Sequence, residues 1–154
     1  MTTPRIKTAA LLLSIATLQA AAFTFIPLGS AHAQEAASVT VTFTGIQTPS
    51  GAIMLGLYDS EAGFDAGKMV QGQRLDVTGP EATVVFSGLK PGRYGIKAYH
   101  DIDGDGRMGT NPFGMPTEPY AASNNARGTM GPPTWADAAF DVAAGETAQT
   151  IAFD

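Results

Sequence analysis

The chain of 154 residues contains no cysteine. Disulfide cross-links, a thiol nucleophile and lipid attachment through a cysteine are therefore excluded. Zinc is disfavoured as well, because its usual sites draw on several Cys and His ligands and the sequence offers only two histidines. The fold must consequently be held by an apolar core alone, for which the chain is long enough.

Basic residues are scarce, with 9 Lys and Arg against 14 Asp and Glu. Without the N-terminal Arg5 and Lys7 the basic count falls to seven, and the net charge from −5 to −7. Nucleic acids and anionic membranes require clustered basic charge, so the sequence argues against both as partners. The acidic balance is compatible with binding cations.

The N-terminus has the three parts of a secretory signal. Two basic residues precede an apolar run over 9–28, and Ala31-His32-Ala33 has the small-x-small pattern of a cleavage site. We predict that residues 1–33 are a signal peptide, and that a single domain over 34–154 is exported to the periplasm or the medium. The alternative is an uncleaved anchor, because about 20 apolar residues just span a bilayer.

The remaining chain alternates apolar and polar residues with a period of two, and helical periodicity is nearly absent. Short strands separated by turn signals favour an all-β fold, a seven-stranded immunoglobulin-like (prealbumin-like) antiparallel sandwich. Tyr94, just after a Pro-Gly turn, is placed to hydrogen-bond backwards to the backbone and pin a sandwich corner. The last two strands are predicted to pair around the turn 143–146. The predicted strands span 39–44, 53–59, 71–78, 81–86, 92–100, 138–142 and 147–153.

One long interval, 101–135, lacks alternation. Loops of this length in compact domains are usually functional or disordered. Five prolines restrict its backbone, so we predict one long ordered loop, a flap that closes one end of the sandwich. Trp135 is expected to anchor this flap on the core; the alternative is a carbohydrate-stacking platform with Tyr120.

Several motifs together carry a resemblance to a known family. They are the acidic run 100–106, the stretch Asn111–Tyr120 with the later Ser123-Asn124-Asn125, the strand entry at Gly88–Tyr94 and the Pro-Pro-x-Trp stretch at 132–135. The chain resembles the secreted bacterial family known as domain of unknown function 2141. The resemblance implies a signal peptide and a sandwich related to transthyretin-like and collagen-adhesin repeat domains. It implies no established activity.

The acidic run is the candidate functional site. Asp101, Asp103 and Asp105 are spaced by two, Gly106 allows a sharp turn, and Arg107 offers a backbone carbonyl. Calcium takes six to eight oxygen ligands, and the pattern D-x-D-x-D-G curls three carboxylates around such an ion. We therefore predict a calcium site. The alternative, an exposed Asp-Gly turn that binds nothing, remains open.

The second half of the run departs from an EF-hand. Pro112 stands where the bidentate Glu belongs, and a strand rather than a helix leads in. The site must therefore be completed from elsewhere, with Glu118 as the missing carboxylate. Three asparagines are further candidates that would provide amide oxygens: Asn111, Asn124 and Asn125.

Two classes of function follow. The first is a non-enzymatic binding or accessory module of the cell envelope, monomeric, with a calcium-ordered loop and an envelope protein or glycan as partner. The second is a carboxylate-dependent, glycosidase-like hydrolase that uses Asp101, Asp103 and Glu118. His100 is expected on the inward face as a hydrogen-bonded structural residue, with a general-base role as the alternative.

Overall fold

The computed structural model describes residues 36–129 and 131–153. The predicted signal peptide lies outside these residues. Within the described part, no helix has the length and apolar character needed to cross a bilayer.

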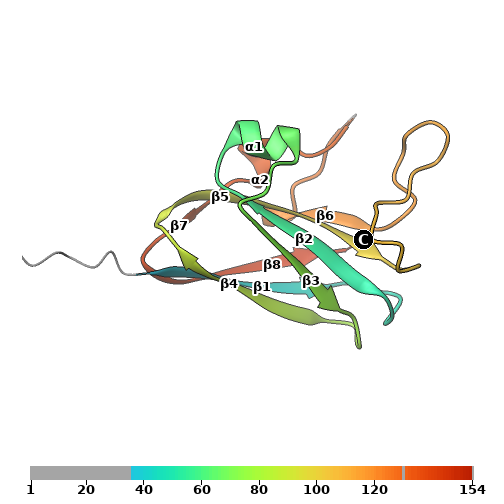
Figure 1. Cartoon of the computed structure of the whole chain (residues 1–154), viewed down its shortest axis with the longest axis horizontal. Helices are drawn as coiled ribbons and strands as arrows, with labels where there is room; N and C mark the ends of the chain where they lie inside the picture. Colours follow the sequence, from blue (N-terminus) through green and yellow to red (C-terminus); the bar gives the residue numbers. More distant parts are fainter. Residues whose placement is uncertain (1–35, 130, 154) are drawn as a thin grey trace, which may run out of the picture. The chain divides into compact units, whose positions relative to one another are not determined.

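The first sheet has three strands in the order β4-β1-β8 (Figure 1). The central strand β1 (Ala37–Thr44) pairs antiparallel with β4 (Ala82–Leu89) and parallel with β8 (Gly145–Ala152). Every second residue of β1 is buried, as the period of two predicts.

The second sheet has the order β3-β2-β5-β6, with β7 also paired to β5. All of its pairings are antiparallel. The long strand β5 is shared by two short partners, because β7 pairs with its first residues and β6 with later ones. The bounds are β2 (Ala52–Tyr58), β3 (Gln71–Asp76), β5 (Gly92–Asp101), β6 (Tyr120–Ala122) and β7 (Phe140–Val142).

The core lies between the two sheets and consists of their inward side chains. Phe43 and Phe86 come from the first sheet, and Ile53, Leu57 and Ile96 from the second; all five are fully buried. Burying an aliphatic or aromatic side chain stabilises a fold by about 1.5–3 kcal/mol. A core of this kind explains how the fold is held without disulfides.

The corner between β4 and β5 has the predicted hydrogen bond. Tyr94 is buried, and its hydroxyl donates to the carbonyl oxygen of Lys90 at 2.9 Å. This bond ties the side chain to the turn that leads from the first sheet to the second. The sequence-based prediction of a tyrosine corner is confirmed.

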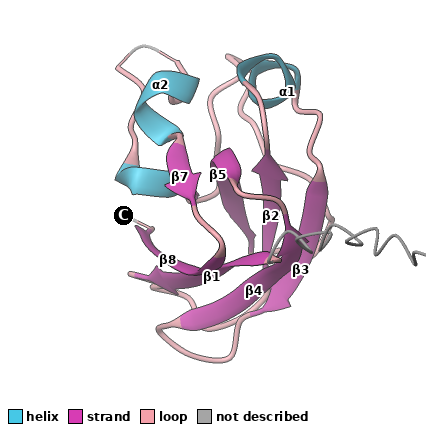
Figure 2. Cartoon of the chain, turned by 90° about the vertical axis from the view of Figure 1, so that its left-hand side faces the viewer, coloured by secondary structure: helices cyan, strands magenta, loops and turns pink. Residues whose placement is uncertain are grey.

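Two short α-helices lie over the outer face of the second sheet (Figure 2), and a 3₁₀ helix lies alongside β8. The α-helix α1 (Glu61–Ala66) begins at Ser60, whose side chain accepts from the Gly63 amide, and ends at Gly67 in the left-handed conformation. The other two are the 3₁₀ helix η1 (Ser123–Asn125) and α2 (Trp135–Ala138). A second apolar cluster forms beneath them from Tyr58, Phe64, Ala122, Ala126 and Ala138, with Trp135 packed against it.

Three of the fold expectations need correction. The described strands number eight, because β6 lies inside the predicted loop 101–135 and adds an edge strand to β5. The last two strands do not pair with each other: β7 joins β5 and β8 joins β1. The pairing of β8 with β1 is parallel, so the sandwich is not wholly antiparallel.

Candidate metal centre

The acidic loop begins where β5 ends. Asp101 is the last residue of β5, is paired with Ala52 of β2, and is 2% exposed. Asp103 and Asp105 follow in the exposed loop. The strand thus fixes the first carboxylate in the sandwich, while the other two reach it from the solvent side.

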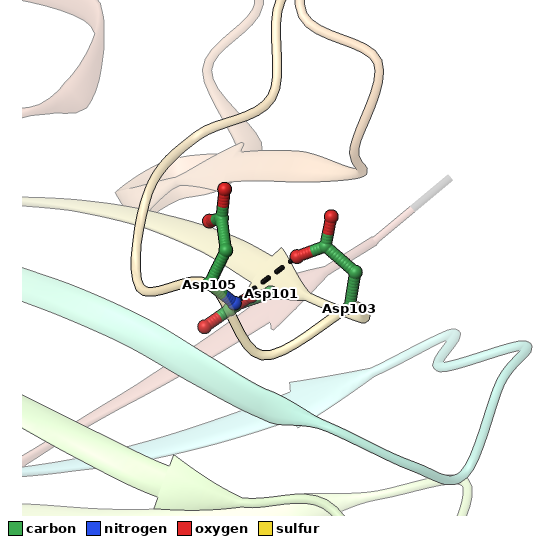
Figure 3. Close-up of side chains that lie close together, drawn as sticks. All are labelled: Asp101, Asp103 and Asp105. Carbon is green, nitrogen blue, oxygen red and sulfur yellow. Dashed lines mark hydrogen bonds between the residues drawn. The ribbon is translucent and has the colours of Figure 1, made fainter.

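The three aspartates converge (Figure 3). Each presents a carboxylate oxygen, and these oxygens all lie within 4.8 Å of one another. The structure therefore brings together Asp101, Asp103 and Asp105, three of the five residues that the sequence proposes as metal ligands.

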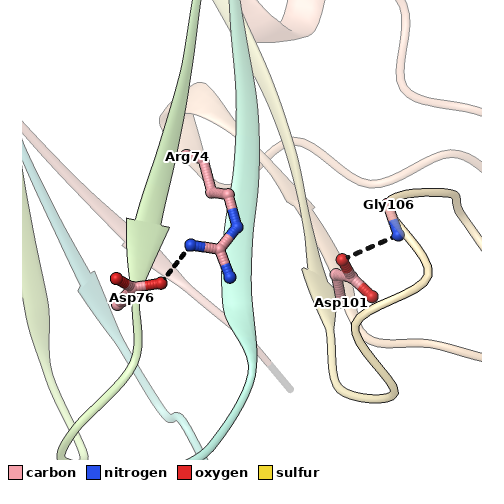
Figure 4. Close-up of polar contacts among 4 residues, drawn as sticks. All are labelled: Arg74, Asp76, Asp101 and Gly106. Carbon is pink, nitrogen blue, oxygen red and sulfur yellow. Dashed lines mark hydrogen bonds and ion pairs between the residues drawn. The ribbon is translucent and has the colours of Figure 1, made fainter.

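Backbone amides fix the carboxylates in place. One oxygen of Asp101 accepts from the amide of Gly104 at 2.9 Å. The other accepts from the amide of Gly106 at 3.0 Å (Figure 4). Both glycines have a φ of 77°, which turns their amides inward and which other residues rarely adopt. Farther along, Asp103 Oδ1 accepts from the amide of Asp105 at 3.1 Å. These bonds preorganise the loop, since the carboxylates need no large rearrangement to face a common point.

The other two proposed ligands, Arg107 and Glu118, hydrogen-bond to other parts of the loop. The Arg107 amide donates to Asp105 Oδ1 at 2.8 Å. Glu118 bridges the two ends of the loop: Oε1 accepts from the Ile102 amide at 3.0 Å, and Oε2 from the Gly109 amide at 2.9 Å. Glu118 thus closes the base of the loop and is not one of the three converging residues. The ligand roles of both residues stay predictions.

The three candidate asparagines stabilise other parts of the fold. Asn111 Oδ1 accepts from the amides of Phe113 and Met115 at the tip of the flap. Asn124 donates to the carbonyls of Asp137 and Ala139, and Asn125 Oδ1 accepts from the Ala152 amide at 2.8 Å. Each of these side chains therefore holds backbone groups in place, and the ligand roles of the three asparagines stay predictions.

The acidic cluster acts electrostatically on Tyr99, the neighbouring residue on the outer face of β5. Its hydroxyl donates to the Gly106 carbonyl at 3.0 Å, so it also ties the loop to the strand. Burial raises the pKa of Tyr99, and the charges of Asp101, Glu118 and Asp105 raise it further. The loop is consequently a region of negative potential.

His100 has the structural position that strand parity predicts. It is 2% exposed on the inward face, and its Nε2 lies 2.7 Å from the carbonyl oxygen of Ser50. A carbonyl oxygen only accepts, so Nε2 carries the proton and donates. The bond joins β5 to the turn before β2. The His100 side chain therefore bonds to the turn before β2. The His100 backbone amide bonds to the flap instead, donating to the carbonyl oxygen of Pro119.

Sequence reasoning missed Ser123, which links η1 to two other elements. It is fully buried; its hydroxyl donates to the Ala138 carbonyl at 2.5 Å and accepts from the Ile96 amide at 2.9 Å. The available signal was its position in the Ser-Asn-Asn run. Trp135 packs edge-on against Phe64 with ring centroids 5.6 Å apart, in agreement with an anchoring role.

The fold and the loop define the class: an all-β sandwich with a preorganised acidic loop at the end of one strand. Comparison with known protein families places the chain in one of them. A family model described as "Uncharacterized protein conserved in bacteria (DUF2141)" matches residues 41–150, and the chain belongs to that family. No curated protein and no solved structure matches.

Proposed function

We propose that the chain is an exported, monomeric, non-enzymatic binding module of the bacterial cell envelope, whose acidic loop is ordered by one calcium ion. The observation that supports this proposal is the convergence of Asp101, Asp103 and Asp105 within 4.8 Å. An envelope protein or a glycan is the proposed partner.

Charge and size favour calcium at this point. Two carboxylates about 4 Å apart repel by about 1 kcal/mol in bulk water and about 4 kcal/mol at an effective dielectric constant near 20. A divalent cation at the centre of the cluster turns this repulsion into attraction. Calcium accepts six to eight oxygens at about 2.3–2.6 Å in a flexible geometry, whereas magnesium requires a near-ideal octahedron at about 2.0–2.1 Å. The Arg107 carbonyl and water would complete the shell.

The flap tip supports a binding role. The segment Thr110–Pro116 is closed by a bridge between its end residues and by the two bonds to Asn111. At its tip Phe113 is 91% exposed and Met115 is 62% exposed. Aromatic residues and methionine are enriched in interface cores, and a hydrogen-bonded turn presents them with little loss of entropy. We assign the partner-binding surface to this tip.

No observation in the described residues favours the hydrolase. That function needs a cleft holding Glu118 beside one of the aspartates. Two pockets, of about 570 and 270 Å³, are lined by other residues, and both Glu118 oxygens already accept backbone hydrogen bonds.

The calcium proposal is tested by thermal unfolding of the purified protein in chelator, in millimolar calcium and in millimolar magnesium. A dissociation constant of about 10⁻⁴ M, usual for extracellular modules, gives about 1.4 kcal/mol at millimolar ion. For a domain of this size we expect the Tm to rise by about 3–6 °C in calcium, and less in magnesium.

Two matched variants complete this experiment. Asp103→Asn removes one converging carboxylate and should therefore abolish the calcium-dependent rise in Tm. The position is exposed, so the amide should leave the fold intact. Asp141→Asn makes the same change at an exposed position on β7 and should retain the rise in full. A Tm that calcium leaves unchanged in the parent protein rules out a calcium site of useful affinity.

Export is tested by the N-terminus of the protein recovered from bacteria. We expect it to begin at Gln34 and to be found in the periplasm or the medium. Recovery of the intact N-terminus in the membrane fraction would instead establish the uncleaved anchor.

A further inference from the structure

A groove of about 570 Å³ lies over the outer face of β5 and β6. The flap around 114–116 forms one wall, and the segment before α2, at 131–133, forms another. The volume is within the range of about 300–1,000 Å³ that small-molecule sites occupy. None of the acidic-loop carboxylates lines this groove, so it is separate from the candidate metal centre.

The walls of the groove are largely apolar. Three prolines contribute to them, and their fixed φ angles limit the freedom of both wall segments. Methionine side chains adapt to differently shaped apolar ligands. The side chains concerned are Met108, Met115, Pro116, Tyr120, Pro132 and Pro133.

Lys97 is the one charged residue among the described residues that line the groove. Its ammonium donates to the Phe64 carbonyl at 2.6 Å and lies 3.9 Å from the centroid of the Phe64 ring. Burial lowers the pKa of Lys97, and the charge of Asp65 acts in the opposite direction. Within the described part of the chain, no carboxylate lies within ion-pair distance of this ammonium.

We propose that this groove binds a small amphipathic monocarboxylate, with its apolar body between the flap and the proline segment and its carboxylate on Lys97. An ammonium has three donors, and only one is used by the Phe64 carbonyl. One positive charge in an apolar lining matches one negative charge. A phosphate dianion would leave excess charge in an apolar environment, and an uncharged ligand would leave the donors of Lys97 unused. This site goes beyond the proposed function and does not depend on calcium.

Decanoate is a suitable probe, and Trp135 is the reporter. The chain has a single tryptophan, which packs on the same Phe64 ring that faces Lys97. We expect decanoate to change its fluorescence saturably, with one site per chain, in chelator as well as in calcium. Decanol has the same chain without the charge and should bind at least about tenfold more weakly.

Charge variants locate the carboxylate. Lys97→Met should remove the preference for decanoate over decanol, and Lys97→Arg should keep it. Lys90→Met changes an exposed lysine on the β4–β5 turn and should behave like the parent protein. A melt of each variant shows whether it is folded. If Lys97→Met does not fold, the parent's decanoate-to-decanol ratio and the variant Met115→Gln, which should weaken both ligands, still test the site.

Two results would overturn this proposal. One is the absence of saturable decanoate binding up to about 1 mM. The other is equal affinity for decanoate and decanol in the parent protein, since Lys97 would then contribute nothing to recognition. Because the titration is done in chelator and in calcium, failure here is distinguishable from failure of the calcium site.

Discussion

The outer faces of the two sheets differ, although the inner faces follow the same period of two. The first sheet exposes a polar surface, where Thr40 donates to Glu146 at 2.6 Å and Thr42 pairs with Thr83 at 3.3 Å. The second sheet is covered by α1 and α2 over a second apolar cluster (Figure 2).

Glycine explains much of this difference. Two glycines lie in the covered sheet, Gly56 on β2 and Gly95 on β5. A Cβ at Gly56 would lie 3.0 Å from the Tyr58 hydroxyl. A Cβ at Gly95 would lie 3.0 Å from Trp135 and 3.2 Å from the Phe64 ring. Covering a sheet thus requires small residues on the strands as well as large ones on the helices, whereas the threonine face needs neither.

The largest expected effect comes from removing the centre of the covered face. Phe64→Ala deletes a fully buried ring that contacts Tyr58 and Trp135, and should lower the free energy of unfolding by about 3–5 kcal/mol. Urea unfolding followed by circular dichroism measures this loss. Val85→Thr, on the exposed face of β4, should stay within about 0.5 kcal/mol. Similar losses in the two variants would contradict the contrast between the faces.

A smaller effect is expected from closing the space that glycine leaves. The new Cβ in Gly95→Ala pushes Trp135 and Phe64 away from β5 and should lower the free energy of unfolding by about 1–3 kcal/mol. The near-ultraviolet circular dichroism of Trp135 should change with it. The control is Gly79→Ala, where the nearest atom to the new Cβ lies 4.0 Å away. If both substitutions prove neutral, close approach at Gly95 does not hold the covering layer.

The smallest expected effect is a dependence of the free energy of unfolding on alkaline pH. Burial under the helices raises the pKa of Tyr58. The unfolded chain therefore ionises this tyrosine first, near pH 10, and the folded state loses stability as the pH rises from there through the folded pKa. Urea unfolding between pH 9 and 11 should show this loss, and Tyr58→Phe should reduce it. A slope that Tyr58→Phe leaves unchanged would show that Tyr58 does not carry this pH dependence.

The edge strands of the first sheet are protected by side-chain amides, and no local sequence pattern predicts this. The side-chain amides of Gln71 and Gln73 on β3 donate to the carbonyls of Ser87 and Val85 on β4. Along β8, Asn125 both donates to the Thr150 carbonyl and accepts from the Ala152 amide. These amides bond the backbone of β4 and β8, which reduces the risk of pairing with another chain. The residues were readable in the sequence, but their partners lie in distant segments.

Local features were predictable from the sequence. The inward side of β5, the hydrogen bond of Tyr94 and the convergence of Asp101, Asp103 and Asp105 all depend on residues a few positions apart. The helix α1 was missed, because its six residues are too few for helical periodicity to show. Its caps, Ser60 and Gly67, were the only local signal.

The inward-facing residues follow from the order of the amino acids, because a strand alternates its side chains whatever it pairs with. The same order also determines the acidic loop, whose aspartates, apart from the buried Asp101, bond amides two residues on. Three features depend on contacts between distant segments: β7 and β8 enter different sheets, β8 runs parallel to β1, and Glu118 closes the loop. The groove with Lys97 likewise combines β5, β6 and two distant loop segments. Pairing between distant segments depends on the whole core and on complementary surfaces, which no short stretch of sequence contains.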